Sequence, residues 1–213
     1  MDNAAPLLQV KGLSFGYPQR ALFQGWSEQI GAGATLVLGG EGSGKTTLLR
    51  LLAGALPANA GTLVLAGVPL VQAPAPQAYQ RQVFWQDPRS NALDALTAQV
   101  WFDGLRAQYP DWNAAALAAH IAGFALAPHL GKPMYQLSVG SKRKVLMAAA
   151  LASGARLTLL DEPVAGLDRS SVQYLEEALS DAAAQPGRAT VVAHYELLGG
   201  VPWCDVIELP DNL

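Results

Sequence analysis

Residues 39–46 have the sequence Gly39-Gly40-Glu41-Gly42-Ser43-Gly44-Lys45-Thr46, which fits the pattern G-x-x-x-x-G-K-[ST] in full. The stretch follows a strand that we expect at residues 35–38, and it precedes apolar residues at helical spacing. Glycines allow the backbone to curl so that successive N–H groups point inward, and the start of the following helix adds partial positive charge. The stretch therefore predicts a loop that cradles phosphate groups.

Two side chains at the end of this loop have specific expected roles. The Lys45 ammonium group supplies a cation to the β- and γ-phosphates, and the Thr46 hydroxyl can ligate Mg²⁺. We also expect the next residue, Thr47, at the nucleotide, together with all of residues 39–46. These residues indicate a nucleoside triphosphate site, and they leave a kinase, a GTPase and an ATPase open as alternatives.

The composition of the chain fits one domain with a sizeable core. Of the 213 residues, 51% are hydrophobic and 15% are charged, a balance that disfavours intrinsic disorder. The net charge of -3 lacks the basic excess that a broad nucleic-acid-binding face needs. The single cysteine, Cys204, excludes a disulfide framework within the chain, and we expect it to be a small buried hydrophobe.

We expect neither a membrane span nor a targeting segment in this sequence. The longest weakly polar stretch, residues 114–127, is shorter than the roughly 20 apolar residues that a span needs. The first residues, Met1 to Pro6, lack the basic end and the apolar run of a signal peptide. If the protein serves a membrane, we expect it to do so through a partner.

The order of the predicted elements favours an α/β body with a helical insertion. We interpret residues 1–213 as a single domain with a helical subdomain at about residues 87–151. Thr97, Asn113 and Ser138 are the expected N-caps of its helices, because their side chains can accept hydrogen bonds from a first helical turn. The expected strands are 7–15, 22–23, 35–38, 63–65, 83–85, 157–160, 190–193 and 206–209, and the expected helices are 45–54, 98–108, 114–124, 138–151 and 170–184.

Two acids follow an apolar run at residues 157–160. Asp161 and Glu162 come directly after this predicted buried strand, and Pro163 ends it. If the strand lies beside the phosphate loop, Asp161 comes near the coordination shell of Mg²⁺. Glu162 can then hold the attacking water and act as a general base. The alternative interpretation is a pair of solvated acids at a strand end, which the neighbouring phosphate loop disfavours.

With these residues in place, the sequence resembles the ATPase subunits of ABC transporters over nearly its whole length. Residues 137–141, Leu137-Ser138-Val139-Gly140-Ser141, resemble the family signature, which is usually written LSGGQ. The other motifs also come in the family's order. They are Tyr17 at the aromatic position that stacks on adenine, Gln86 at the Q-loop, Ala165-Gly166-Leu167-Asp168 at the D-loop and His194 at the switch histidine.

The resemblance implies a P-loop NTPase fold of the ABC ATPase type, with a RecA-like core, an antiparallel β part and a helical subdomain. It implies ATP and Mg²⁺ as cofactors, with Thr46, Gln86 and Asp161 at the metal ion. The catalytic residues are then Glu162, His194 and Gln86, with His194 orienting the water and Glu162.

The resemblance also implies two partners. Ser138 and Gly140 form a second anion site, which in the family serves the ATP of another subunit, so two copies enclose two ATP molecules head to tail. Asp168 and Tyr17 are further expected nucleotide contacts. A transmembrane permease subunit is the other expected partner, with Gln86 linking it to the nucleotide. The chain is then cytoplasmic and peripheral on the inner face of the membrane, without bound nucleic acid.

The kind of transporter is indicated by two stretches and by length. Residues 109–112 and 137–144 are similar to small ATPases of ABC-2-type exporters, and small haem-exporter ATPases are similar in length, so we expect an exporter. Two alternatives remain: a soluble ABC-type ATPase in DNA repair or translation, and a regulatory cassette that does not hydrolyse ATP. The intact Lys45, Asp161, Glu162 and His194 argue against the regulatory cassette.

The chain departs from the family pattern at two places. Ser141 replaces the signature glutamine, and Lys142-Arg143-Lys144 follow it at the start of a predicted helix. This basic run is either a solvated face or a contact with phosphate or an acidic partner. Glu41 stands in the phosphate loop where the family often has Asn, and its carboxylate repels a triphosphate unless it points away.

Overall fold

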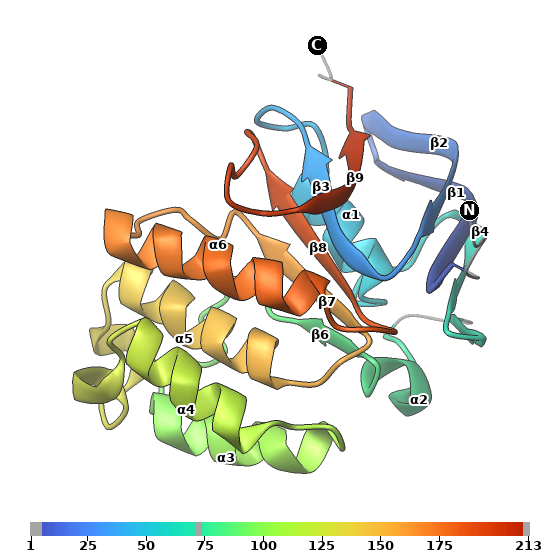
Figure 1. Ribbon diagram of the computed structural model, residues 1–213. Helices are drawn as coiled ribbons and strands as arrows, with labels where there is room; N and C mark the ends of the chain where they lie inside the picture. Colours follow the sequence, from blue (N-terminus) through green and yellow to red (C-terminus); the bar gives the residue numbers. More distant parts are fainter. Residues whose placement is uncertain (1–5, 71–73, 211–213) are drawn as a thin grey trace.

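The computed structural model describes residues 6–70 and 74–210, so the expectation for the first five residues lies outside the described part of the chain. The described residues form a mixed α/β body with two sheets and a group of helices (Figure 1). This architecture confirms the α/β class predicted from the sequence. None of the described helices combines the length and the apolar character that a membrane crossing needs.

A five-stranded parallel sheet forms the centre of the molecule. Its strands are β3 (Gly33–Leu38), β6 (Val83–Trp85), β7 (Leu157–Asp161), β8 (Ala189–His194) and β9 (Trp203–Glu208), in the order β6-β7-β8-β3-β9. All residues of β7 and β8 are buried, as expected for parallel strands covered on both faces. β8 lies between β7 and β3, yet Asp161 at the end of β7 reaches Thr46 at the phosphate loop, as the sequence-based expectation required.

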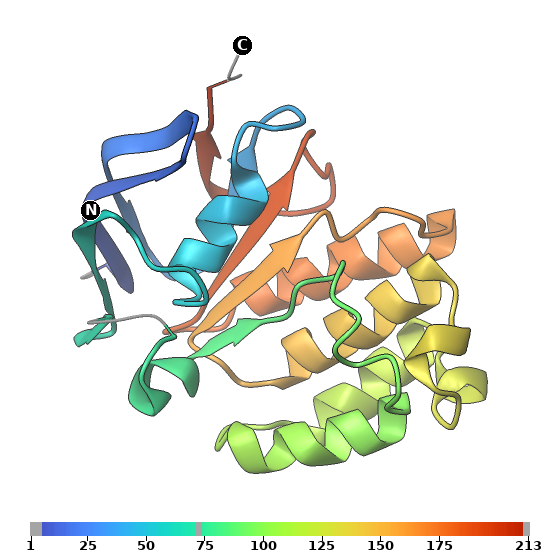
Figure 2. The ribbon, with the colours of Figure 1, turned by 180° about the vertical axis from the view of Figure 1, so that it is seen from behind.

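Alternate residues of this sheet face two different layers of helix. Leu159 and Val191 belong to the hydrophobic cluster that contains α1 (Lys45–Leu52). Their neighbours Leu160 and Val192 belong to the cluster on the opposite face, which contains residues of α5 (Val139–Ala152) and α6 (Arg169–Ala183). Since successive strand side chains point to opposite faces, the unbroken apolar runs fill both layers. Figures 1 and 2 show the two layers from opposite sides.

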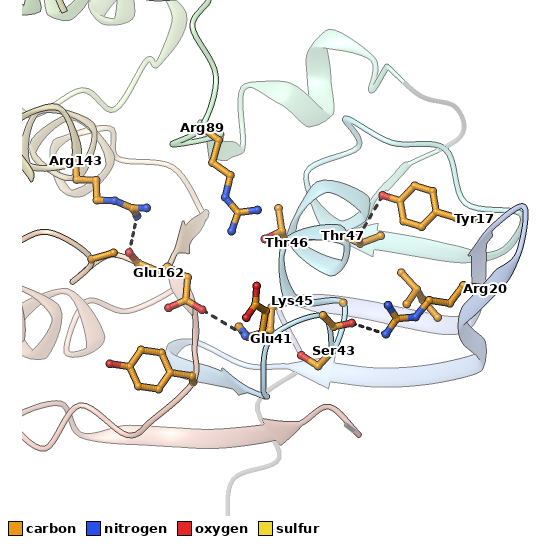
Figure 3. A pocket seen from close by; sticks show the side chains of 15 residues that line it. Tyr17, Arg20, Glu41, Ser43, Lys45, Thr46, Thr47, Arg89, Arg143 and Glu162 are labelled. Atoms are coloured by element: carbon orange, nitrogen blue, oxygen red, sulfur yellow. Dashed lines mark hydrogen bonds and ion pairs between the residues drawn. The ribbon is translucent and has the colours of Figure 1, made fainter. Parts of the chain in front are cut away.

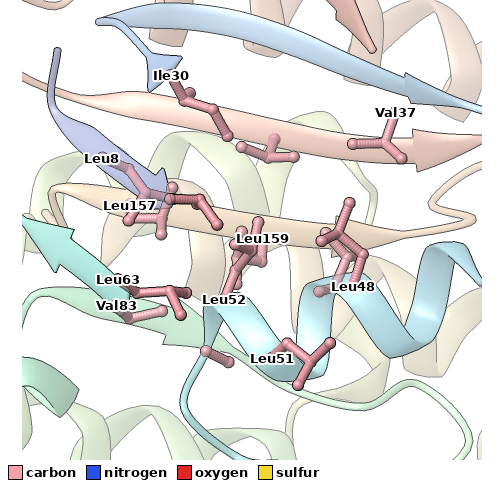
Figure 4. Packing of buried hydrophobic residues seen from close by; sticks show 14 of the residues in the cluster. Leu8, Ile30, Val37, Leu48, Leu51, Leu52, Leu63, Val83, Leu157 and Leu159 are labelled. Carbon is pink, nitrogen blue, oxygen red and sulfur yellow. The ribbon is translucent and has the colours of Figure 1, made fainter. Parts of the chain in front are cut away.

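An antiparallel sheet covers the other side of α1. Its strands are β1 (Leu8–Tyr17), β2 (Arg20–Ile30), β4 (Ala60–Leu65) and β5 (Val68–Leu70), in the order β2-β1-β4-β5. Leu48, Leu51 and Leu52 of α1 share one cluster with Leu8 and Leu63 of this sheet (Figure 4). The helix behind the phosphate loop is therefore fixed by apolar packing between two sheets.

The helical part contains α3 (Ala98–Gln108), α4 (Ala114–Gly123) and α5. Thr97, Asn113 and Ser138 cap these helices, and each side chain accepts a hydrogen bond from a first-turn N–H group. The three predicted caps are thus confirmed. Helix α5 contacts α3, α4 and β7, so it joins the helical part to the parallel sheet. The short helices are α2 (Gln77–Gln80), η1 (Ala127–His129) and η2 (Met134–Gln136).

Two local expectations are wrong. The strand expected at residues 22–23 is present but its expected length is wrong, because it is part of the longer β2, which pairs with β1 along most of its length. Cys204 is exposed rather than buried. The reason is its position on β9, which is the edge strand of the parallel sheet and lies next to β3 alone.

Candidate active site

A cavity of about 790 Å³ opens between the phosphate loop and the end of β7 (Figure 3). It receives side chains from β1 and β2, from the phosphate loop with α1, and from loops around β6, β7 and β8. Its lining residues are Tyr17, Arg20, Leu22, Glu41, Gly42, Ser43, Gly44, Lys45, Thr46, Thr47, Arg89, Arg143, Glu162, Ala165 and Tyr195.

The phosphate loop joins β3 to α1, as the sequence predicts. Gly44 has a φ of 101°, a conformation that glycine adopts without the steric cost of a side chain. It precedes α1 as a cap that offers no side-chain hydrogen bond to the first turn. The N–H groups of that turn and the helix dipole therefore form an anion-binding site at the cavity.

The Lys45 side chain is held inside the loop. Its Nζ atom donates hydrogen bonds to the carbonyl oxygens of Gly39 at 2.7 Å and Gly40 at 2.8 Å. It also lies 3.3 Å from Oε1 of Glu162 (Figure 3). Gly39 and Gly40 thus act through their carbonyl groups beneath the cavity and do not line it. A phosphate group that enters the cavity must compete with these three contacts for the ammonium group.

Asp161 and Thr46 form the second element of the site. Thr46 Oγ1 donates a hydrogen bond of 2.7 Å to Oδ2 of Asp161. The other oxygen, Oδ1, is buried and has no hydrogen-bond partner among the described residues. Burial raises the pKa of the Asp161 carboxyl group, and the hydrogen bond from Thr46 acts in the opposite direction. A hydroxyl group beside a carboxylate with an unsatisfied oxygen is a donor set that fits Mg²⁺.

Glu162 and His194 face each other across the ends of β7 and β8. His194 is fully buried, and its Nε2 atom lies 3.5 Å from Oε2 of Glu162. The other ring nitrogen, Nδ1, lies 3.0 Å from the carbonyl oxygen of Glu196. Glu162 has a φ of 46°, in the left-handed region that is unusual for a residue with a side chain. Such backbone strain clusters at functional sites, where surrounding contacts maintain it.

Tyr17 forms the outer wall of the cavity. The residue is 45% exposed, and its ring packs against Phe15 in a T-shaped contact. Its hydroxyl group lies 3.4 Å from Oγ1 of Thr47. The Thr47 side chain therefore supports the Tyr17 wall. Glu41 also lines the cavity, and it is exposed to solvent.

Three arginines at the cavity were not singled out by the sequence motifs. Arg20 Nη2 donates to the Gly42 carbonyl oxygen at 2.8 Å, and Arg89 extends into the cavity from the segment after β6 (Figure 3). Arg143 comes from α5. Burial lowers the pKa of its guanidinium group, and the charge of Asp161 acts in the opposite direction. Only Arg143 had a sequence signal, since it lies inside the basic run after the signature.

That basic run is not a solvated face. Lys142 Nζ donates to the Ser90 carbonyl oxygen at 2.9 Å and pairs with Asp94 at 2.5 Å. Lys144 pairs with Asp168 at 2.8 Å. The first interpretation in the sequence analysis is therefore wrong, because the acidic partners lie within the chain itself.

The signature residues lie apart from the cavity in the same chain. Ser138 caps α5 and is exposed, and the backbone of Gly140 packs so closely on Gly166 that a Cβ would lie 2.1 Å from its carbonyl oxygen. Asp168 caps α6 by accepting from the Ser171 N–H group. Gln86 lines a small recess behind Asp161 rather than the main cavity.

Comparisons with known proteins agree with this geometry. A family model described as "ABC transporter" matches residues 23–165. The cytochrome c biogenesis ATP-binding export protein CcmA of Alkalilimnicola ehrlichii is 36% identical over 212 residues, which cover 98% of this chain and 89% of that protein. The nickel import ATP-binding protein NikO of Rhodobacter capsulatus is 32% identical over 90% of this chain and 80% of its own length.

A solved structure shows the same fold. It is the structure of a bacterial Atm1-family ABC exporter with ATP bound. The superposition covers 99% of this chain and 39% of the exporter chain, with a TM-score of 0.78 and 20% sequence identity. The likeness confirms the P-loop NTPase fold of the ABC ATPase type.

Proposed function

Since the chain belongs to the ABC transporter family and is one of its ATP-binding ATPase subunits, we propose that it binds Mg-ATP in the cavity described above and drives an exporter. The observation that carries the proposal is the convergence of Lys45, Thr46, Asp161 and Glu162 on one cavity, with His194 behind them. The export function rests on the name of CcmA, the relative that matches this chain along 98% of its length.

Some residues of the cavity bind the nucleotide and the metal ion, and others take part in hydrolysis. Lys45 moves from the Gly39 and Gly40 carbonyl groups to the β- and γ-phosphates, and Tyr17 stacks on the base. Thr46 and Asp161 would hold Mg²⁺, and Gln86, which lines a recess together with Asp161, would be the third residue at the ion. The ion supplies positive charge that offsets the charge of the triphosphate.

Glu162 is the general base of this mechanism. When Lys45 turns to the phosphates, the Glu162 carboxylate loses its closest cation and becomes free to accept a proton from the attacking water. His194 holds the carboxylate and the water in place through Nε2.

We also propose that two copies of the chain enclose ATP between them. Ser138 and Gly140 stand at the start of α5, and Val139 between them is 68% exposed. This helix start is turned away from the cavity of its own chain, so it can serve the nucleotide of a second copy. Asp168, beside the signature helix through Lys144, completes the contact surface.

A membrane permease is the second proposed partner. We place its contact on the helical subdomain at about residues 87–151 of a single domain, 1–213, where Val100 and Tyr135 are 56% and 65% exposed. The chain is then peripheral on the cytoplasmic face of the membrane. The relatives CcmA and NikO are named as an export and an import protein, which disfavours a role in DNA repair or translation.

Hydrolysis by the purified chain tests the proposal. The full-length protein should hydrolyse Mg-ATP, and Glu162→Gln should lose most of the roughly 10²–10⁴-fold that a general base contributes while it still binds ATP. Affinity purification from membranes should recover a multi-span protein. A chain that binds Mg-ATP but hydrolyses none, alone or in its membrane complex, contradicts the proposal.

A further inference from the structure

Arg143 connects the signature helix to the catalytic end of β7 within one chain. Its Nη1 atom donates hydrogen bonds to the backbone carbonyl oxygens of Asp161 at 3.0 Å and Glu162 at 2.5 Å. Figure 3 shows the bond to Glu162. The guanidinium group therefore holds the backbone of the two acids, and the same side chain lines the cavity. Its Nε atom is buried without a hydrogen-bond partner among the described residues.

The double contact depends on the unusual conformation of Glu162. In an extended strand, successive carbonyl groups point to opposite sides of the chain, so one donor cannot reach two of them. At a φ of 46°, Glu162 lies in the left-handed region and departs from the extended strand. The Asp161 and Glu162 carbonyl oxygens both accept from the single Nη1 atom of Arg143.

The conformation needs support from outside the strand. Residues with a Cβ atom seldom occupy this region. Among the described residues that are not glycine, Glu162 shares a positive φ only with Ala66 and Ala125. A positively charged donor between the two carbonyl oxygens stabilises the arrangement, since hydrogen bonds from an ionised donor are stronger than neutral ones.

We propose that Arg143 is a positioning residue for ATP hydrolysis, which maintains the left-handed backbone of Glu162 and so directs its carboxylate toward His194 and the phosphate loop. The inference rests on the proposed function of Glu162 as the general base. Arg143 acts through the backbone, because its two hydrogen bonds to the acids both go to carbonyl oxygens. Its loss should lower the rate of hydrolysis more than the affinity for Mg-ATP.

Lys142 offers a matched control for this test. It is the preceding residue of the same helix, it carries the same charge, and it also joins α5 to another segment, through Ser90 and Asp94. Within the described part of the chain, the hydrogen bonds and the ion pair of its side chain go to Ser90 and Asp94 and not to Asp161 or Glu162. A general loosening of α5 should therefore affect Lys142→Ala and Arg143→Ala alike, whereas a positioning role should affect Arg143→Ala alone.

The experiment compares kcat and the Mg-ATP dissociation constant of the full-length chain and its variants. We expect Arg143→Ala to lower kcat by about 10- to 100-fold, the size of a small misplacement of a catalytic group, with the dissociation constant within about threefold of the parent. Guanidinium chloride at low millimolar concentration should restore part of the rate of Arg143→Ala, compared with sodium chloride at equal ionic strength. It should leave Lys142→Ala unchanged.

A double variant separates this inference from the proposed function. If Arg143 acts through Glu162, adding Arg143→Ala to Glu162→Gln should lower kcat no further. Full additivity, or equal loss in Arg143→Ala and Lys142→Ala, overturns the positioning role and leaves the proposed function intact. A parental rate in Glu162→Gln instead overturns the assignment of the base itself.

Arg143→Lys serves if the alanine variant does not fold. It keeps the buried charge, but the shorter side chain cannot hold both carbonyl oxygens. A lower kcat at an unchanged dissociation constant supports the inference, and a parental kcat contradicts it.

Discussion

Lys45→Ala tests the phosphate site most directly, because the structure shows which contacts the ammonium group gives up. In the free protein, Nζ bonds two carbonyl oxygens and lies beside the Glu162 carboxylate. Binding of ATP exchanges these contacts for phosphate oxygens. The contribution of Lys45 to affinity is therefore the difference between the two sets, and it is smaller than the sum of the new bonds.

The expected size follows from that exchange. A hydrogen bond to a charged group contributes about 1.5–3 kcal/mol, and we expect a net gain of about one such bond when the ammonium group meets a triphosphate. Lys45→Ala should then weaken Mg-ATP binding by about 10- to 150-fold. The free protein should also lose some stability, because the partly buried carbonyl groups of Gly39 and Gly40 lose the hydrogen bonds that the ammonium group donates.

Isothermal titration calorimetry with Mg-ATP measures the affinity, and thermal unfolding without nucleotide measures the stability. Lys132→Ala is the control, since Lys132 is exposed and lies outside the cavity. If Lys45→Ala bound Mg-ATP within twofold of the parent, the exchange of contacts described above would be refuted.

Three further predictions concern the contact of Tyr17 with the adenine ring, the dimer that forms with ATP, and the packing of Gly140. Tyr17→Ala should weaken ATP binding by several-fold in calorimetry, whereas Tyr17→Phe, which removes only the 3.4 Å contact with Thr47, should bind like the parent. Glu162→Gln should elute as a dimer in size-exclusion chromatography with ATP and as a monomer with ADP; a monomer at saturating ATP contradicts the two-copy arrangement. Gly140→Ala places a Cβ 2.1 Å from the Gly166 carbonyl oxygen, so it should lower the unfolding temperature and abolish that dimer, and parental stability would count against this packing.

The parts of the fold that sequence could predict are those with a local physical cause. The cap residues Thr97, Asn113 and Ser138 were predictable because a cap needs only one side chain and the turn after it. The order of the strands in the sheets was not predictable, because it depends on contacts between segments that are distant in the sequence. Asp161 still reaches Thr46, although β8 separates their strands.

The arginines at the cavity show the same limit for the site. Arg20 and Arg89 lie in segments without a motif, and only the fold brings them to the phosphate loop. The prediction that Cys204 is buried was wrong. Cysteine is among the residue types that are most often buried, but this cysteine lies on an edge strand, where it is exposed. Lys142 and Lys144 were left open, because their partners are 48 and 24 residues away in the chain.

The contacts of α5 give a physical reason why the two halves of the proposed site are linked. Arg143 donates hydrogen bonds to the backbone of Asp161 and Glu162. The next residue of the helix, Lys144, pairs with Asp168, which lies two residues after the exposed Gly166. The same helix begins at Ser138, which we propose meets the ATP of a second copy. A shift of α5 when that ATP is engaged must therefore move or break contacts at both the general base and the segment before α6. In the proposed two-copy arrangement, the catalytic geometry of each chain would then depend on whether the other chain's nucleotide occupies its signature helix.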